Sequence, residues 1–195
     1  MSKKSLHIDI ETYSDVDLAS CGVYRYADSP VFTIQLFSYA FGDEPVTRLD
    51  LMQGDVIPRR VLKALRDPKR IKYAHNAQFE RVCIGYYLDG KPLDPTSWRC
   101  TMVWGSFLGL PQSLDGMSTA LGLDVKKDKE GKRLIQYFAK PCKPTKANGG
   151  RTQNLPKHAP EDWELYGVYN EKDVIVERAI DRELRAIYEP PAHEW

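Results

Sequence analysis

The sequence has no long hydrophobic run and only four cysteines. No apolar stretch approaches the roughly 20 residues that a membrane-spanning helix requires, and the start of the chain lacks the apolar core of a signal peptide. The cysteines (Cys21, Cys83, Cys100 and Cys142) form no Cys-x-x-Cys pair and have no histidines at zinc-ligand spacing. These absences argue against a zinc module and against a membrane protein. We expect free thiols and a cytoplasmic location.

Length and composition predict one globular domain over residues 1–195, with 42% apolar and 28% charged residues. The net charge of +1 hides a strong asymmetry. Between Lys126 and Lys157, ten basic residues face two acidic ones, whereas ten acids face four bases between Ala159 and Trp195. A basic stretch next to acidic residues suits a polyanion held by its backbone, and the alternative is a solvated basic loop.

Alternating strand and helix patterns predict an α/β layer fold. We expect strands at residues 6–11, 32–41, 46–51 and 71–75, and helices at residues 56–66, 76–87, 102–110, 113–121, 133–138 and 160–188. The segment of about residues 140–158 is rich in proline and glycine, which predicts a long flexible loop that is either functional or disordered.

Two carboxylates lie close together on the first predicted strand. Asp9 and Glu11 are two residues apart, so their side chains project from one face with about 6–7 Å between their backbone positions. This pair can hold one cation jointly and share a second. An exposed strand face would explain Asp-x-Glu equally well, but we expect this strand to be central and covered by helices, where two like charges require a cation.

A third carboxylate follows the strand at residues 71–75. Asn76 and Glu80 stand where the next helix begins, which by itself suits a helix cap and an acid in the first turn. The alternative is that this junction directs Glu80 to the same site as Asp9 and Glu11, with Asn76 ordering the site or binding substrate.

The last predicted helix carries a fourth carboxylate. An apolar stripe at spacings of three and four residues contains Leu165, Tyr169, Asp173, Val176, Ile180, Leu184 and Ile187. A carboxylate at Asp173 on a buried stripe is costly unless it is paired or bound to metal. Tyr169, one turn earlier, would place its hydroxyl beside Asp173. A buried Tyr–Asp hydrogen bond would explain this pair but not the other two acidic clusters.

These residues resemble the three motifs of the DEDD superfamily of 3′–5′ exonucleases. The motifs are Asp9-Ile10-Glu11-Thr12, His75-Asn76-Ala77-Gln78-Phe79-Glu80 and Tyr169-x-x-x-Asp173. Tyrosine four residues before the aspartate is typical of the tyrosine subclass, whereas Val168 stands where the sister subclass has histidine. Over nearly the whole chain the sequence is similar to the proofreading domain of bacteriophage and bacterial family A DNA polymerases.

The resemblance implies a ribonuclease H-like exonuclease fold with a mixed five-stranded sheet flanked by helices. It implies that Asp9, Glu11, Glu80 and Asp173 are ligands of two divalent metal ions, Mg²⁺ or Mn²⁺, and that Tyr169 orients the attacking water. Glu80 stands where the superfamily has aspartate, and its longer side chain is expected to reach the metal with altered spacing or rate. We expect either an excised polymerase domain or a separately encoded exonuclease.

The predicted function is hydrolysis of DNA from its 3′ end to nucleoside 5′-monophosphates, in replication proofreading. Single-stranded or frayed 3′ ends are the expected substrate, and a DNA polymerase subunit or domain is the expected partner. Thr12, Asn76 and Phe79 are the predicted substrate contacts near the metals, with Tyr13 as a further stacking candidate. Lys143, Lys146 and Arg151 of the long loop are the predicted phosphate contacts. The alternatives are an RNA-trimming 3′–5′ exoribonuclease and a non-catalytic nucleic-acid-binding accessory module of a polymerase.

Overall fold

The computed structural model describes residues 4–123 and 130–190, which form a five-stranded mixed sheet between two layers of helices. The strands are β1 (Leu6–Tyr13), β2 (Thr33–Phe41), β3 (Thr47–Asp50), β4 (Lys72–Ala74) and β5 (Trp98–Cys100), in the order β3-β2-β1-β4-β5. β1 pairs antiparallel with β2 and parallel with β4. The expected mixed five-stranded sheet is confirmed, and so is the central position of the first strand.

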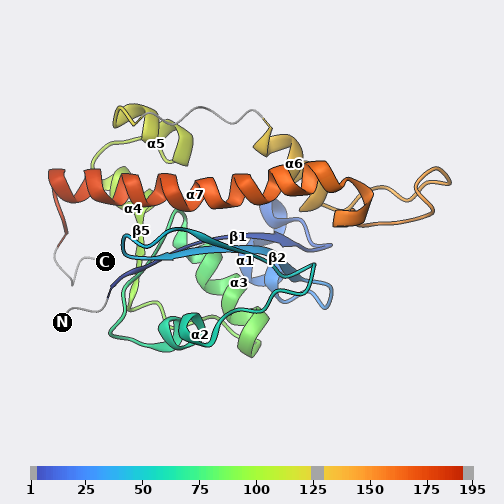
Figure 1. Ribbon diagram of the computed structural model, residues 1–195, viewed down its shortest axis with the longest axis horizontal. Helices are drawn as coiled ribbons and strands as arrows, with labels where there is room; N and C mark the ends of the chain where they lie inside the picture. The colour runs from blue at the N-terminus through green and yellow to red at the C-terminus, as the bar shows by residue number, and fades with distance from the viewer. Residues whose placement is uncertain (1–3, 124–129, 191–195) are drawn as a thin grey trace.

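The helices lie on both faces of this sheet (Figure 1). One face is covered by the long helix α7 (Pro160–Ile187), which also packs against α4 (Thr101–Phe107), α5 (Leu114–Ala120) and α6 (Gly131–Phe138). The other layer contains α1 (Leu18–Ala27), α2 (Arg59–Arg66) and α3 (Ala77–Asp89), whose apolar residues join one core cluster with the sheet. α7 therefore crosses the sheet directly above its central strand.

β1 directs its alternate side chains to these two layers. Leu6, Ile8 and Ile10 pack into the core cluster that also contains residues of α2 and α3. His7 and Glu11 point the other way and bond to side chains of α7. The predicted alternation is confirmed, and it places the polar face of β1 under the long helix.

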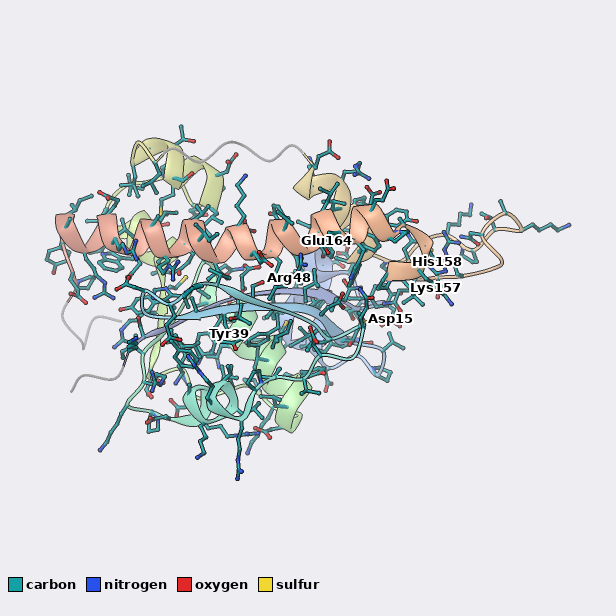
Figure 2. The ribbon with its side chains drawn as sticks, in the orientation of Figure 1. Asp15, Tyr39, Arg48, Lys157, His158 and Glu164 are labelled. Atoms are coloured by element: carbon teal, nitrogen blue, oxygen red, sulfur yellow. The ribbon has the colours of Figure 1, made fainter. Side chains whose placement is uncertain are left out.

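An ion-pair cluster fixes the first half of α7 on the edge of the sheet. Arg48 on β3 reaches up to Glu164, 2.7 Å from its Oε1 (Figure 2), and to Glu171 at 3.3 Å. A Cβ atom at Gly167 would collide with the Arg48 guanidinium, so the absent side chain leaves room for this contact. The cluster holds α7 in one register along the sheet.

Most of the expected elements are confirmed, with three differences. α2 begins at Arg59 because Pro58 occupies its N-cap, so Val56 lies outside the helix. α1 and β5 were not expected from the sequence. The predicted buried stripe is wrong at its ends: Leu165 is 49% exposed and Ile187 is 59% exposed. The buried face of α7 instead includes Trp163, Tyr166, Asn170, Val174, Glu177 and Asp181.

The long basic loop leaves the body of the protein as an arm at the N-terminal end of α7 (Figure 1). We call residues 140–155 the basic arm. It is closed by hydrogen bonds from Cys142 N to Thr152 O (2.8 Å) and from Gly150 N to Thr145 O (2.9 Å). A short 3-10 helix, Pro156–His158, then leads into α7, and Lys157 and His158 mark this junction in Figure 2. Lys126, Lys127 and Lys129 of the basic stretch lie outside the described residues.

Among the helices of the described residues, none is both long enough and apolar enough to cross a lipid bilayer.

Candidate active site

The carboxylates of β1 are held from above by neutral side chains of α7. The Tyr166 hydroxyl donates to Glu11 Oε2 at 2.6 Å, and Asn170 Nδ2 donates to Asp9 Oδ2 at 2.5 Å. About two turns further along α7, Glu177 Oε2 lies 2.7 Å from His7 Nδ1. Each of these polar side chains on β1 therefore has its own partner on α7. From His7 to Glu11 along β1, the partners run from Glu177 back to Tyr166 along α7.

Glu80 enters from the opposite side of the sheet, in the first turn of α3. Asn76, just before the helix, has a left-handed backbone with φ of 71° and makes no side-chain capping hydrogen bond. This turn carries the chain from β4 into α3 and buries Glu80, which is 3% exposed. Asn76 therefore occupies the N-cap position of α3 as expected, but without a side-chain capping hydrogen bond, and the acid in the first turn of α3 is present as expected.

Tyr169 and Asp173 lie on the flank of α7, between its buried and exposed faces. Both are half-buried, so the assumption that Asp173 lies on a fully buried stripe is wrong. The hydroxyl of Tyr169 hydrogen-bonds to the Asp173 carboxylate, as expected from their spacing of one turn. The pair faces an open cavity rather than the packed core.

The four carboxylates act on one another electrostatically. Burial raises the pKa of Asp9 well above its usual range, and the charges of Asp173, Glu11 and Glu80 raise it further. Burial likewise raises the pKa of Glu11 to about 8, against the lowering effect of the Tyr166 hydrogen bond. The pKa of Glu80 is raised by burial and by neighbouring carboxylates. Such shifts arise where several like charges share a site without a counter-charge.

The donor set fits a hard divalent cation. It consists of carboxylate oxygens, which Mg²⁺ and Mn²⁺ prefer. Glu80 Oε2 is buried without a hydrogen-bond partner among the described residues, and a buried carboxylate oxygen requires one. Within residues 4–123 and 130–190, no three acidic, histidine or cysteine side chains already converge on a single metal position. Binding of a shared ion would therefore require these carboxylates to turn toward one position.

A cavity of about 520 Å³ opens beside Tyr169 and Asp173, between α5, α6 and α7. Its wall is partly apolar, with Leu114, Ile135 and Val176 among the lining residues. Three lysines also line it: Lys132, Lys140 and Lys172. A cavity that joins acidic residues, an apolar wall and several lysines suits a nucleotide, which combines a planar base with a phosphate.

The predicted substrate contacts near the carboxylates have different environments. Thr12 is 3% exposed, and its hydroxyl lies 2.8 Å from the Tyr26 hydroxyl, so it is already used inside the fold. Tyr13 is also buried and donates to Thr152 O at 3.3 Å. Phe79 is half-buried with its ring 6.0 Å from that of Tyr26, whereas Asn76 is exposed. Of these, Phe79 and Asn76 keep surface that a substrate can reach.

The basic arm holds the other predicted substrate contacts. Lys143 and Lys146 are exposed. Arg151 is used inside the arm, where its Nε donates to Asn154 Oδ1 at 2.9 Å. The arm projects from the N-terminal end of α7 (Figure 1), and Thr152 within it accepts a hydrogen bond from Tyr13 at the end of β1.

Sequence reasoning missed the partners of the carboxylates and the lysines of the cavity. Tyr166, Asn170 and Glu177 recur at spacings of three, four and seven residues around Asp173, which is a helical-face signal. An apolar stripe cannot reveal them because two of them are polar. The sequence places Lys132 and Lys140 in the basic stretch between Lys126 and Lys157, but it does not indicate that they line a cavity.

Comparisons with known proteins agree with this geometry. No protein-family model matches the chain. Over 177 residues, or 91% of its length, the chain is 56% identical to the DNA polymerase of Bacillus phage SP02. The chain spans only about a quarter (27%) of that polymerase.

Among solved structures, Brucella melitensis NrnC superposes with a TM-score of 0.60 at 14% identity, covering 94% of this chain and 73% of that one. Escherichia coli RNase D, an exoribonuclease involved in structured RNA processing, gives 0.51 at 16% identity, covering 94% and 40%. At these identities the likeness concerns the fold alone. The expected ribonuclease H-like exonuclease fold is confirmed.

Proposed function

We propose that this chain, a homologue of part of a phage DNA polymerase with the fold of the DEDD 3′–5′ exonucleases, is a metal-dependent 3′–5′ exonuclease acting on DNA. The observation that carries the proposal is the electrostatic coupling of four carboxylates from three elements, one of which lines a cavity together with Tyr169. The hydrolysis would release nucleoside 5′-monophosphates, and its biological role would be proofreading in replication. The proposed partner is a polymerase domain or subunit, and the proposed compartment is the cytoplasm.

Asp9, Glu11, Glu80 and Asp173 would hold two divalent ions, Mg²⁺ or Mn²⁺. When bound, such ions would lower the pKa of a water molecule and neutralise charge on the leaving oxygen. The Tyr169 hydroxyl, beside Asp173, would orient that water against the scissile phosphate. Tyr166 and Asn170 keep Glu11 and Asp9 in fixed orientations, so the chain itself supplies position rather than a nucleophile.

The cavity beside Tyr169 is the proposed seat of the strand end. A volume of about 520 Å³ suits one unpaired nucleotide rather than a duplex end, which favours single-stranded or frayed 3′ ends. Lys132 and Lys140 would contact phosphates inside the cavity, whereas Lys143 and Lys146 on the basic arm would contact the strand further from its end. The side chain of Arg151 supports the arm and would act there through its remaining donors.

DNA is favoured over RNA by the 56% identity with a DNA polymerase. An exoribonuclease with the same carboxylates is the second candidate, because the fold is shared with an RNA-processing enzyme. A non-catalytic binding module is the third, and the presence of all four carboxylates and Tyr169 argues against it.

The test is digestion of a 5′-labelled single-stranded DNA oligonucleotide with Mg²⁺ or Mn²⁺, beside an RNA of the same sequence. Wild type should give a ladder that shortens from the 3′ end and disappears with EDTA. Asp9→Ala and Asp173→Ala should each abolish the ladder. Glu171→Ala is the matched control, since this acid lies on the same helix but pairs with Arg48 on the other side.

Faster shortening of the RNA would establish the exoribonuclease instead. Tight DNA binding without shortening in either metal would establish a binding module. A ladder that persists in Asp9→Ala would refute the assigned site.

A further inference from the structure

Asn170 is a completely enclosed polar side chain near the proposed metal site. It is 0% exposed, and both ends of its amide are bonded. Nδ2 donates to Asp9 Oδ2 at 2.5 Å, and Oδ1 accepts from the Ser38 hydroxyl at 2.5 Å. Ser38 is itself fully buried. It is the direct cross-strand partner of Asp9 in the β1–β2 ladder.

In the ionised state that a metal ligand requires, Asp9 allows a single arrangement of these groups. An ionised carboxylate only accepts hydrogen bonds, so Asp9 faces the NH₂ end of the amide. The amide oxygen of Asn170 then faces Ser38, whose hydroxyl must donate. Ser38 therefore fixes the orientation of the amide, and the amide fixes one oxygen of Asp9. The other oxygen of Asp9 is left for a different partner.

We infer that Ser38 and Asn170 form a relay that positions the Asp9 carboxylate for a divalent cation. Asn170 is the positioning residue, and Ser38 acts through it. This inference rests on the proposed function in assigning Asp9 to a metal. Outer partners that orient a metal ligand typically change metal affinity by about 10–100-fold when they are removed. The Tyr166 hydroxyl likewise donates to Glu11. Among the described contacts, however, no second buried side chain bonds to that hydroxyl as Ser38 bonds to Asn170.

The relay also explains why a polar residue occupies this position of α7. A buried amide without partners would be destabilising, and an apolar residue would leave both Ser38 and Asp9 without theirs. With both ends bonded, Asn170 adds no charge to a site that already holds four carboxylates. An aspartate there would be isosteric, but it would add a fifth negative charge and remove the donor.

The experiment measures Mn²⁺ affinity directly, from the signal of free Mn²⁺ in electron paramagnetic resonance, together with kcat and KM on single-stranded DNA. Asn170→Ala and Ser38→Ala are compared singly and together. The matched control is Asn154→Ala, because Asn154 is also a buried asparagine bonded at both ends, to Tyr137 O and Arg151. It lies at the end of the basic arm and touches no carboxylate of the site.

Asn170→Ala should weaken Mn²⁺ binding by about 10–100-fold and lower kcat at subsaturating metal, with KM for DNA little changed. Ser38→Ala should give a smaller loss in the same direction. The double variant should resemble Asn170→Ala alone, since both act through one carboxylate. Asn154→Ala should lower Tm without changing Mn²⁺ affinity.

Unchanged Mn²⁺ affinity in Asn170→Ala, or additive losses in the double variant, would overturn the relay. If Asn170→Ala does not fold, Ser38→Ala decides alone, because it removes a single oxygen. A wild type that binds Mn²⁺ but does not shorten DNA would refute the proposed nuclease while leaving the relay standing. A wild type that digests DNA, with Asn170→Ala indistinguishable from the control, would do the reverse.

Discussion

The packing of Gly131 against Tyr169 offers a steric test of the proposed role of that tyrosine. Gly131 begins α6 and is buried. A Cβ atom placed there would lie 2.6 Å from Cδ2 and 2.9 Å from Cζ of the Tyr169 ring, and closer still to Cε2. Carbon atoms normally approach to about 3.5–4.0 Å. Gly131→Ala must therefore push the ring, and the hydroxyl bonded to Asp173, by about 1 Å.

A displacement of about 1 Å at a catalytic group can cost about 10²-fold in rate. We therefore expect Gly131→Ala to lower kcat by about 100-fold in steady-state digestion of single-stranded DNA, with a small change in KM. Gly105→Ala is the control, since its Cβ would instead collide with Met117 in the core below α4 and α5. That control should lose Tm and retain kcat.

A second arm of the experiment isolates Tyr169. Tyr169→Phe removes the hydroxyl, and adding Gly131→Ala to it should then cost little more, because the displaced group is already absent. Unchanged kcat in Gly131→Ala would refute the claim that the ring position matters. So would a full 100-fold loss in the Tyr169→Phe background, which would show that the effect travels by another route.

Two further predictions concern charge. Because the pKa of Glu11 is raised to about 8 in the folded state, that state binds more protons than the unfolded chain from about pH 4.5 to 8. Tm measured without metal should therefore fall as pH rises through this window, and a level Tm would contradict this. Adding Mg²⁺ should reduce the fall in Tm. Binding of Mg²⁺ should also release protons, which calorimetry in buffers of different ionisation enthalpy can measure. Paired alanine variants at Lys132 and Lys140, and at Lys143 and Lys146, should each flatten the salt dependence of single-strand binding by about 0.7 per lost phosphate contact, and an unchanged slope would remove that pair from the interface.

Local signals explain which parts of the fold could be predicted. The alternation in β1, the proline at the start of α7 and the Asp67-Pro68 end of α2 each act within a few residues, so the sequence shows them directly. β5 has only three residues and exists through pairing with β4, a contact that no local pattern reveals. α1 contains Gly22 with φ of 75°, which interrupts the helical repeat within the element.

The error in the α7 stripe has a geometric cause. In the first half of the helix the stripe is rotated away from the inward face, since Leu165 is 49% exposed while Trp163 and Tyr166 on either side of it are 3% and 0% exposed. At the other end, Ile187 is the last residue of α7 and is 59% exposed. Over the sheet, the inward positions at Asn170 and Glu177 are polar because the strand below presents polar residues. Hydrophobic periodicity counts such positions as solvent-facing, so it assigned the wrong face at both places.

Glu80 differs from Asp9 and Glu11 in its hydrogen-bond partners. Asp9 and Glu11 each receive a hydrogen bond from a neutral side chain of α7, so part of their burial is compensated before any cation arrives. Glu80 rises from the opposite layer, and its Oε2 has no partner among the described residues. A buried carboxylate oxygen without a donor is the costliest of these arrangements, so among the four proposed ligands Glu80 would gain most from a bound cation. The longer side chain at this position is thus consistent with a site where the fourth carboxylate must reach the metal without help from α7.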